Sequence, residues 1–331
     1  VEQNKVEQIK EWKNKLDFST GIIFEETTSR TYPYNTLAST ILGFTNSDNS
    51  GAYGIEYSWN SFLSGTAGKS VSLKDASQSE IANSEKSYIA AENGYDLNLT
   101  IDVNIQGIIE RELATAVDEY ECDSGITIAM DPSNGKILAM ADYPNFDPNN
   151  YQDYDMETLS RNLPIWMTYE PGSTFKIITT AAAVEEGVVN LEKDTFYDSG
   201  SVTVSGAKIR CWKSGGHGSQ TFLQVFENSC NPGFVEMGFR LGKEKLFSYL
   251  DLFGFGDKTG IDLSGESTGI IFPLEDVKDL ELATTAFGQG VSVTPIQQVT
   301  AVSSIVNGGY LLKPYVLNSI LDSKTNNIIL S

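Results

Sequence analysis

The chain has 331 residues, of which 40% are hydrophobic, and its 44 acidic residues outnumber its 23 Lys and Arg to give a net charge of −21. This length predicts two domains with a sizeable core, and the charge excludes nucleic acid as a partner because its phosphates would be repelled. No apolar run reaches the 18 or so residues that a membrane span needs, and no segment has the three-part pattern of a signal peptide. Since the chain begins at Val1, we expect any membrane anchor to lie outside this sequence.

The sequence of the first 95 residues predicts a support module without a catalytic or metal site. Apolar residues at near-helical spacing predict a surface amphipathic helix over residues 1–17. A strand-like stretch follows at 21–25, and the polar stretch 69–93 is typical of an extended linker or an exposed hairpin. This part contains no nucleophile with a base, no metal-ligand spacing and no phosphate loop. We therefore expect residues 1–95 to form a pedestal domain.

The second part, residues 96–331, predicts an α+β domain. Residues 97–101 alternate as a strand should, and Asp102 can cap the helix that follows. Two nearly apolar segments, 125–130 and 136–141, flank a turn and predict a buried antiparallel hairpin. A hairpin followed by helices and further strands is the pattern of an α+β fold.

A serine and a lysine three residues apart mark the candidate catalytic helix. Pro171 and Gly172 end the preceding segment, so Ser173 opens an Ala- and Ile-rich helix from whose same face Lys176 projects. A serine hydroxyl is a poor nucleophile alone, and a neutral amine within hydrogen-bond reach activates it. The same spacing recurs at 133–136 and 205–208, but both pairs lie in predicted turns and cannot be held on a helix face.

A second polar pair follows later in the chain. Ser229 and Asn231 lie on a short connection between a predicted helix at 222–228 and another that begins at Pro232. Such a connection can direct a hydroxyl and an amide into a cleft. The tripeptide pattern is common, so its weight comes from its position after Ser173.

The scarce metal-ligand residue types fall close together. Of three cysteines and one histidine, Cys211, His217 and Cys230 lie within twenty residues in a Gly-rich stretch that is flexible enough to converge. Tetrahedral zinc needs one more ligand, for which Asp198 is the candidate. Two other interpretations stay open: a Cys211–Cys230 disulfide, or two unpaired thiols with an exposed histidine. If zinc binds, we expect it to support the segment of Ser229 rather than to activate water.

Several stretches of the chain resemble the class B penicillin-binding proteins, in the group of the sporulation and division transpeptidases. In the pedestal these stretches are Arg30-Thr31-Tyr32-Pro33, Leu42-Gly43-Phe44-Thr45, Gly54-Ile55-Glu56-Tyr57 and Leu63-Ser64-Gly65. In the second domain they are Leu99-Thr100-Ile101-Asp102 through Gln106, Pro171-Gly172-Ser173-Thr174-Phe175-Lys176, Ser229-Cys230-Asn231, and Phe287-Gly288-Gln289-Gly290 through Pro295. The resemblance covers nearly all of the chain in the family's order.

The resemblance implies a fold and a location. The family fold is a five-stranded antiparallel sheet between helical layers, carried on an elongated pedestal. The family acts at the extracytoplasmic face of the bacterial membrane, held by a single N-terminal helix that is absent from this sequence. We therefore also expect a partner among the membrane glycosyltransferases of cell-wall synthesis.

The resemblance also implies an activity, D,D-transpeptidation of peptidoglycan stem peptides. By that likeness Ser173 is the nucleophile, Lys176 accepts its proton, Ser229 passes a proton to the leaving amine, and Asn231 holds the substrate amide. The backbone N–H of Ser173 would supply half of the oxyanion hole. β-Lactams would acylate Ser173 as substrate mimics.

One family feature is missing from the sequence. The family's third motif, Lys-Thr/Ser-Gly on an edge strand, matches only residues 258–260, which lie in a turn-rich connector without strand alternation. Residues 324–326 lack the glycine. We exclude both and expect the third motif beyond Ser331. Two other functions stay open: a non-catalytic cell-wall scaffold, or a serine β-lactamase or β-lactam sensor.

Overall fold

The computed structural model describes residues 3–15, 22, 28–71 and 87–330 of the chain. Its contacts group the chain into two units, Val1–Thr31 and Tyr32–Ser331. The first unit contains helix α1 (Gln3–Lys15), which confirms the predicted amphipathic helix over the residues described. Apart from Ile22, the predicted strand at 21–25 lies outside the described residues. No helix within the described ranges is both long and apolar enough to cross a membrane.

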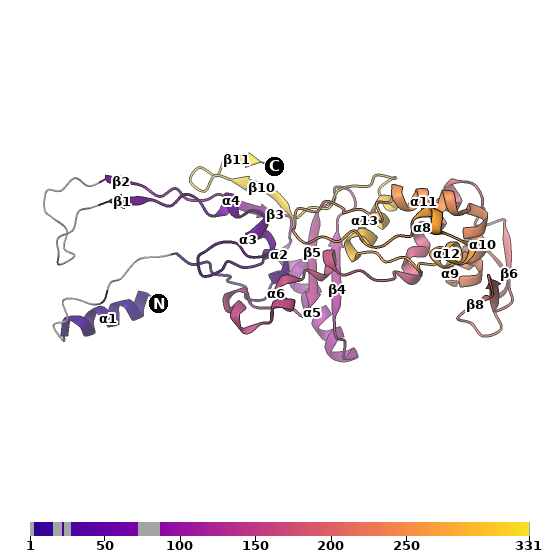
Figure 1. The fold of residues 1–331 in the computed structure, drawn as a ribbon, viewed down its shortest axis with the longest axis horizontal. Coiled ribbons are helices and arrows are strands. Elements are labelled where there is room, and N and C mark those ends of the chain that lie inside the picture. Colours follow the sequence, from indigo (N-terminus) through magenta and orange to yellow (C-terminus); the bar gives the residue numbers. More distant parts are fainter. Residues whose placement is uncertain (1–2, 16–21, 23–27, 72–86, 331) are drawn as a thin grey trace. The chain divides into compact units, whose positions relative to one another are not determined.

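The second unit begins with short helices and a hairpin (Figure 1). The helices are α2 (Ser39–Leu42), α3 (Gly54–Ser58) and α4 (Asn60–Leu63). Strands β1 (Lys69–Val71) and β2 (Ser87–Ile89) pair antiparallel, so the hairpin interpretation of residues 69–93 is confirmed for the described strands. Strand β3 (Asp96–Leu99) pairs antiparallel with β10 (Leu317–Leu321), whose other edge pairs with β11 (Ile328–Leu330).

The predicted helix cap and hairpin are both present. The Asp102 side chain accepts hydrogen bonds from the backbone nitrogens of Asn104 and Ile105 and so caps α5 (Val103–Tyr120). Strands β4 (Gly125–Met130) and β5 (Ile137–Tyr143) pair antiparallel. Strand β5 is largely buried as expected, whereas β4 is only half-buried. The reason is that β5 packs closely against α5, while Gly125, Ile126 and Ile128 of β4 line an open cavity.

The remaining helices of the second domain follow in chain order. They are α6 (Met156–Ser160), α7 (Leu163–Trp166), α8 (Lys176–Glu185), α9 (Phe222–Glu227), α10 (Asn231–Leu241), α11 (Lys243–Leu252), α12 (Asp279–Thr285) and α13 (Pro295–Val306). Three 3₁₀ turns accompany them: Pro148–Asp153, Gly172–Phe175 and Leu274–Asp276. Helix α8 packs against α10, α11 and α13, which places the catalytic segment at the centre of this helical layer.

The Gly-rich stretch after α8 is more regular than the sequence indicates. Strand β6 (Thr195–Asp198) pairs antiparallel with β9 (Gly218–Thr221). Between them β7 (Ser201–Val204) and β8 (Ala207–Arg210) form a second antiparallel pair. Ser205 and Gly206 form the turn of that hairpin, in agreement with the exclusion of the 205–208 pair. Two ladders of backbone hydrogen bonds thus hold the segment that carries the candidate metal ligands.

A buried carboxylate links the pedestal residues to the second domain. Asp142 on β5 accepts a hydrogen bond from the Thr40 hydroxyl at 2.7 Å and another from the Leu163 backbone nitrogen at 2.9 Å. Burial raises the pKa of Asp142 to about 6, because desolvation outweighs these hydrogen bonds. The boundary at residue 95 stays a prediction, since residues 32–331 form one unit by contacts.

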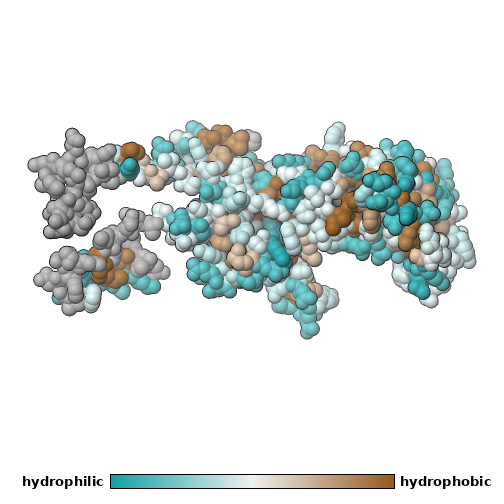
Figure 2. Space-filling model, viewed as in Figure 1, coloured by the Kyte–Doolittle hydropathy of each residue, from teal (hydrophilic) through white to brown (hydrophobic). Residues whose placement is uncertain are grey.

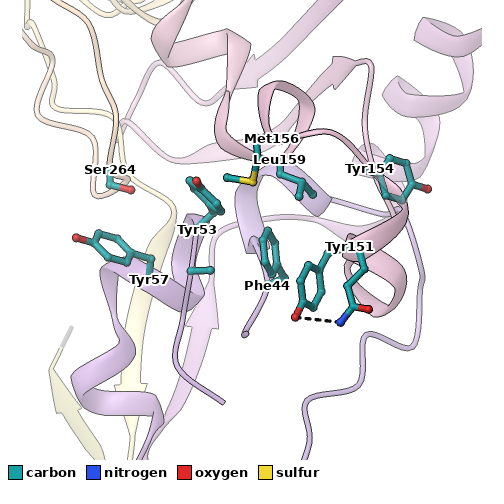
Figure 3. A pocket seen from close by; sticks show the side chains of 10 residues that line it. Phe44, Tyr53, Tyr57, Tyr151, Tyr154, Met156, Leu159 and Ser264 are labelled. Carbon is teal, nitrogen blue, oxygen red and sulfur yellow. Dashed lines mark hydrogen bonds between the residues drawn. The ribbon is translucent and has the colours of Figure 1, made fainter. Parts of the chain in front are cut away.

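Figure 2 shows hydrophilic and hydrophobic residues interspersed over the visible surface. An aromatic cavity of about 810 Å³ opens between pedestal and second-domain residues of the same unit. Phe44 and Tyr151 stack in its wall with ring centroids 4.3 Å apart (Figure 3). None of the candidate catalytic or metal-ligating residues lines it.

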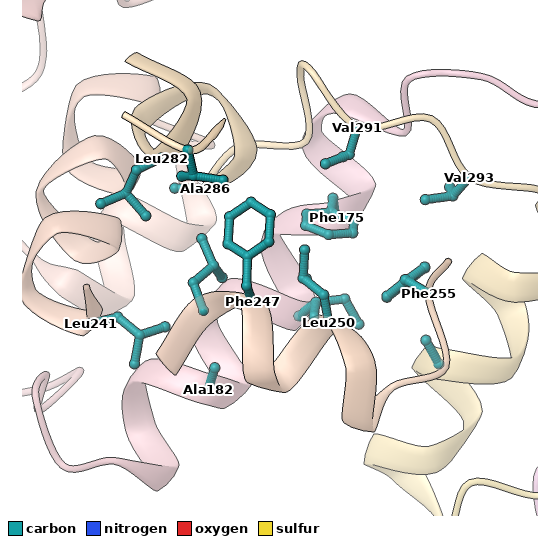
Figure 4. Close-up of a cluster of buried hydrophobic side chains, with 14 residues drawn as sticks. Phe175, Ala182, Leu241, Phe247, Leu250, Phe255, Leu282, Ala286, Val291 and Val293 are labelled. Atoms are coloured by element: carbon teal, nitrogen blue, oxygen red, sulfur yellow. The ribbon is translucent and has the colours of Figure 1, made fainter. Parts of the chain in front are cut away.

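The hydrophobic core behind α8 fixes the position of the catalytic segment. Phe175 is fully buried and meets Phe255 with ring centroids 5.2 Å apart. Around them lie Ala182 of α8, Leu250 of α11 and Val293 (Figure 4). Because these side chains interlock, the start of α8 cannot shift without opening a cavity in the core.

Candidate active site

The two members of the Ser-x-x-Lys pair differ sharply in exposure. Ser173 lies in the 3₁₀ turn that leads into α8 and is exposed, whereas Lys176 opens α8 and is only 2% exposed. Gly187 adopts a positive φ of 66° just past the end of the helix, as expected for a C′ glycine. The predicted helix start is therefore confirmed, with one turn of 3₁₀ geometry before it.

Ser229 owes its orientation to the way α9 ends. Its backbone nitrogen bonds to the Phe226 carbonyl at 2.9 Å, and the nitrogen of Cys230 bonds to the Val225 carbonyl at 3.0 Å. These two bonds form a Schellman motif, in which the residue at the left-handed position is usually glycine. Ser229 occupies that position with φ 51°. Left-handed geometry at a non-glycine residue costs free energy and tends to occur at functional positions.

A continuous hydrogen-bond chain joins the candidate catalytic residues. The Oγ atoms of Ser229 and Ser173 are 2.9 Å apart. Lys176 Nζ donates to Ser229 Oγ at 2.9 Å, to the Ser229 carbonyl at 2.9 Å and to Asn231 Oδ1 at 2.7 Å. The structure therefore brings all four predicted residues together.

The order of these contacts differs from the expectation of a direct serine–lysine pair. Among the described residues, no hydrogen bond joins Ser173 to Lys176, and the Ser229 hydroxyl lies between them. Lys176 uses all three of its donors on Ser229 and Asn231. The geometric reason is that the end of α9 and the start of α10 cover the lysine, while Ser173 stays at the surface.

Burial makes Lys176 easier to deprotonate. Desolvation lowers the pKa of Lys176 to about 8, and the neighbouring Cys230 and Cys211 oppose this shift only in part. The ring of Phe234 on α10 also faces the ammonium group, with Nζ 5.1 Å from its centroid. A lysine with this pKa is neutral in about one molecule in ten at pH 7.

A glycine loop supports the segment of Ser173 from behind. The backbone nitrogen of Gly172 donates to the Gly288 carbonyl at 2.9 Å, and that of Gly290 donates to Glu170 Oε1 at 2.7 Å. Gly288 has φ 79°, and a Cβ added there would stand 2.2 Å from the Gly172 carbonyl oxygen. Only glycine fits such a close approach of two backbones.

The four candidate metal ligands converge on one point. One ligand atom from each of Asp198, Cys211, His217 and Cys230 lies within 4.8 Å of all the others. Asp198 Oδ2 is 3.0 Å from His217 Nδ1 and 3.4 Å from Cys230 Sγ, and Cys211 Sγ is 3.3 Å from His217 Nδ1. Tetrahedral zinc with these donors requires ligand separations of roughly 3.3–3.8 Å. The donor types fit zinc, and the three separations of 3.0, 3.3 and 3.4 Å lie at or just below the lower end of this range.

The cluster is buried, and its titratable side chains shift one another's pKa values. The side chains of Asp198 and His217 are 0% and 6% exposed. Desolvation and the nearby Asp198 carboxylate raise the pKa of Cys230 to about 12. Burial would raise the pKa of Asp198 too, but hydrogen bonds from Cys211, His217 and the Gly200 backbone hold it below its ordinary value. Cys211 and Cys230 are not joined by a disulfide.

The excluded third-motif candidate has a structural role. Glu266 accepts hydrogen bonds from the backbone nitrogens of Thr259 and Gly260, and from the Thr259 hydroxyl. Residues 258–260 lie outside any strand, in agreement with their exclusion.

Two features of the site were not found in the sequence. The position of Ser229 between Ser173 and Lys176 depends on the left-handed turn after α9. The ring of Phe234 over Lys176 depends on α10 crossing α8. The Phe287–Gly290 stretch resembles the family in sequence, and its glycines are the signal from which its support of Gly172 can be predicted.

Two family models match the chain. The penicillin binding protein transpeptidase domain matches residues 125–329, and the penicillin-binding protein dimerisation domain matches residues 1–99. The chain belongs to the penicillin-binding protein transpeptidases. The predicted family and the transpeptidase fold are thereby confirmed, although the described residues form antiparallel sheets of two or three strands rather than the expected one of five.

Named relatives of this penicillin-binding protein share much of its sequence. It is 53% identical to Stage V sporulation protein D of Bacillus subtilis over 93% of the chain and 48% of the relative. It is 30% identical to the peptidoglycan D,D-transpeptidase FtsI of Escherichia coli K12 over 87% of the chain and 48% of the relative. The chain thus spans about half the length of these relatives.

A solved structure gives the same fold. The structure of penicillin binding protein 3 from Mycobacterium tuberculosis complexed with aztreonam matches with a TM-score of 0.78 at 25% identity. The match covers 91% of this penicillin-binding protein and 63% of that chain.

We expect Gly288→Ala to misplace Ser173. The new Cβ would collide with the Gly172 backbone and move the neighbouring Ser173 away from Ser229, so covalent labelling by a fluorescent penicillin should slow roughly 10- to 100-fold. Gly308→Ala is the control, because Gly308 has φ 92° but nothing within 4 Å of a Cβ. The Gly308→Ala variant introduces a similar backbone strain at a positive φ, but its Cβ collides with no other atom. Equal labelling of both variants would contradict the supporting role of Gly288.

Proposed function

We propose that this penicillin-binding protein contributes the nucleophile and proton relay of a serine D,D-transpeptidase that cross-links peptidoglycan stem peptides. The observation that carries the proposal is the chain from exposed Ser173 Oγ through Ser229 Oγ to Nζ of buried Lys176. The names of its relatives, among them the peptidoglycan D,D-transpeptidase FtsI, support the same activity.

The relay depends on the charge of Lys176. A protonated lysine donates to Ser229, whose own hydroxyl then donates to Ser173 and occupies one of its two lone pairs. A neutral Lys176 has two N–H donors and one lone pair. The Ser229 carbonyl and Asn231 Oδ1 can accept the two hydrogen bonds, which leaves the lone pair free to accept one. The Ser229 hydroxyl then donates to Lys176 and accepts from Ser173. Loss of one proton thus reverses the chain and directs the Ser173 proton toward the base.

Acylation follows from this geometry. Ser173 Oγ attacks the carbonyl carbon of the bond before the terminal D-alanine, and its proton passes through Ser229 to Lys176. The C–N bond then breaks, and the leaving amine takes the proton back along the same path. The amine of a second stem peptide attacks the resulting ester and gives its proton to Lys176, the ester C–O bond breaks as the new amide forms, and the proton returns through Ser229 to Ser173 Oγ. The backbone N–H of Ser173 would donate to the developing oxyanion.

A β-lactam ring would enter by the same first step. Opening of the ring keeps the leaving amine attached to the acyl group, so the ester on Ser173 persists. A serine β-lactamase would instead release the hydrolysed product rapidly, and a non-catalytic scaffold would form no ester.

The wider setting of the activity is also part of this proposal. The intact protein would act on the cell wall outside the cytoplasmic membrane, held by an N-terminal anchor. A membrane glycosyltransferase would supply the glycan strands whose stem peptides it joins.

We propose in addition that Asp198, Cys211, His217 and Cys230 hold a structural zinc ion. Zinc would accept electron pairs from two thiolates, one imidazole and one carboxylate, and so compensate the buried charge of Asp198. Cys230 lies between Ser229 and Asn231 in the chain. A metal bound there would fix the second catalytic segment against strands β6 to β9.

Replacement of Ser173 tests the nucleophile. We expect Ser173→Ala to abolish covalent labelling by a fluorescent penicillin while thermal unfolding stays unchanged, because an exposed hydroxyl adds little to the core. Ser133→Ala, in the turn that shares the Ser-x-x-Lys pattern, should label like the wild type. An adduct on the Ser173→Ala chain in intact-mass measurement would refute the assignment. Rapid release of the label from the wild type would favour a β-lactamase, and no label would favour a scaffold.

Metal analysis and chelation test the zinc site. We expect about one zinc ion per purified chain. Chelation, Cys211→Ser or His217→Ala should each lower the thermal midpoint and slow penicillin labelling, because the Ser229 segment loses its support. Cys122→Ser is the matched control, since Cys122 is an exposed cysteine away from the cluster. A metal-free chain whose mass is two protons below the reduced value would replace the zinc site with a disulfide.

A further inference from the structure

Beside the catalytic segment lies a cavity of about 400 Å³ whose charge is opposite to that of the chain as a whole. Lys208, Arg210 and Lys213 line it, and no acidic side chain does. The chain as a whole has 44 acidic and only 23 basic residues. Ionic screening limits the reach of the distant acidic groups to about 8 Å at physiological salt, so the local cations set the potential of the cavity.

The β7–β8 hairpin places these cations together. Residues of the two strands pair as Ser201 with Arg210 and Thr203 with Lys208, so these four side chains share one face of the hairpin. The other face carries Val202, Val204 and Ile209, which pack into the core that includes Cys211 and Cys230. The core thus forces Lys208 and Arg210 to project outward, where Figure 2 shows hydrophilic residues in the region of β8.

The three cations have no anionic partner in the part of the chain that the structure describes. Among the residues that the structure describes, no ion pair or side-chain hydrogen bond involves Lys208, Arg210 or Lys213. Ser201 and Ser214 line the same cavity and offer hydroxyl donors, whereas the Ser199 hydroxyl donates to the Ser201 carbonyl. Cations with hydroxyl donors and no competing carboxylate are the chemistry that binds a carboxylate or a phosphate.

Hydrogen bonds from side chains to backbone carbonyls connect this cavity to the candidate catalytic residues. The carbonyl of Arg210 accepts a hydrogen bond from Asn231 Nδ2 at 3.5 Å. The Trp212 indole N–H donates to the Asn228 carbonyl at 2.7 Å, one residue before Ser229. Arg210 and Trp212, the two residues on either side of Cys211, therefore both contact the segment 228–231. A peptide whose reactive amide lies at Ser173 and Ser229 would have its neighbouring residues within reach of this wall.

We propose that the cavity formed by Lys208, Arg210 and Lys213 binds a side-chain carboxylate of the peptide substrate and so contributes to substrate selection. This inference rests on the proposed transpeptidase function, because it takes the ligand to be a peptide held at Ser173. Arg210 can bind the carboxylate through two parallel N–H groups, and the two lysines add charge. The ion pair would orient the peptide and would take no part in bond making.

Paired peptides test the cavity on the Ser173→Ala chain, in which no turnover occurs. Both peptides end in D-Ala-D-Ala. One carries a side-chain carboxylate and the other carries the corresponding carboxamide. Binding is followed by the fluorescence of Trp212, which is 70% exposed and lines the cavity. A Trp212→Phe variant identifies the share of the signal that comes from this residue. We expect the carboxylate peptide to bind roughly tenfold more tightly, with a smaller difference at high salt.

Charge-removing variants show where the carboxylate binds. With binding followed by calorimetry, Arg210→Gln combined with Lys208→Gln should remove the preference and leave the affinity of the carboxamide peptide unchanged. Lys324→Gln, an exposed lysine in the β10–β11 turn, should keep the preference. Equal or absent binding of the two peptides, a preference that survives the double variant, or phosphate binding as tight as the peptide would each overturn the proposal.

The proposed function can fail separately from the cavity. Penicillin labelling of the wild type reports only on Ser173. A chain that does not label but still prefers the carboxylate peptide would contradict the transpeptidase assignment and not the cavity.

Discussion

The candidate active site depends on the burial of one amine. Lys176 is 2% exposed and donates to three oxygens, all of them supplied by Ser229 and Asn231. Taking an ammonium group out of water is costly, and the protein compensates only in part, which lowers the pKa of Lys176 to about 8. A hydrated lysine would keep its proton and could not act as a base at neutral pH. The core beneath Phe175, the end of α9 and the start of α10 all serve to keep water from this group.

Two polar features lie next to the candidate catalytic residues around Lys176: the buried metal-ligand cluster and the cationic β7–β8 hairpin. Cys230 lies between the candidate residues Ser229 and Asn231 and is part of the buried Asp, His and Cys cluster, so a metal ion there would act on Ser229 through the peptide bond that joins the two residues. On the other side of Cys211, the β7–β8 hairpin exposes its cations beside Asn231. The stretch between Asp198 and Asn231 thus contains both the buried Asp, His and Cys cluster and the exposed cations. Its glycine content alone would suggest a flexible loop.

The sequence was sufficient for features that depend on local spacing. The cap at Asp102, the helix start at Ser173 and the β4–β5 hairpin follow from periodicity and turn chemistry over a few residues. It also placed the four metal-ligand candidates, because cysteine and histidine are rare in this chain. It did not predict that Ser229 separates Ser173 from Lys176. That contact joins residues 56 positions apart and depends on how far α9 and α10 cover α8, which no local pattern contains. The half-burial of β4 was missed for the same reason.

The pH dependence of Ser173 acylation tests the central claim most directly. The second-order rate constant for labelling of the wild type by a penicillin would be measured from pH 6 to 10. Since only neutral Lys176 can accept the proton, the account predicts a rate that rises about tenfold per pH unit and levels off above pH 8 or so. A rate independent of pH, or one that keeps rising toward the ordinary lysine pKa of 10.5, would contradict a buried Lys176 as the base.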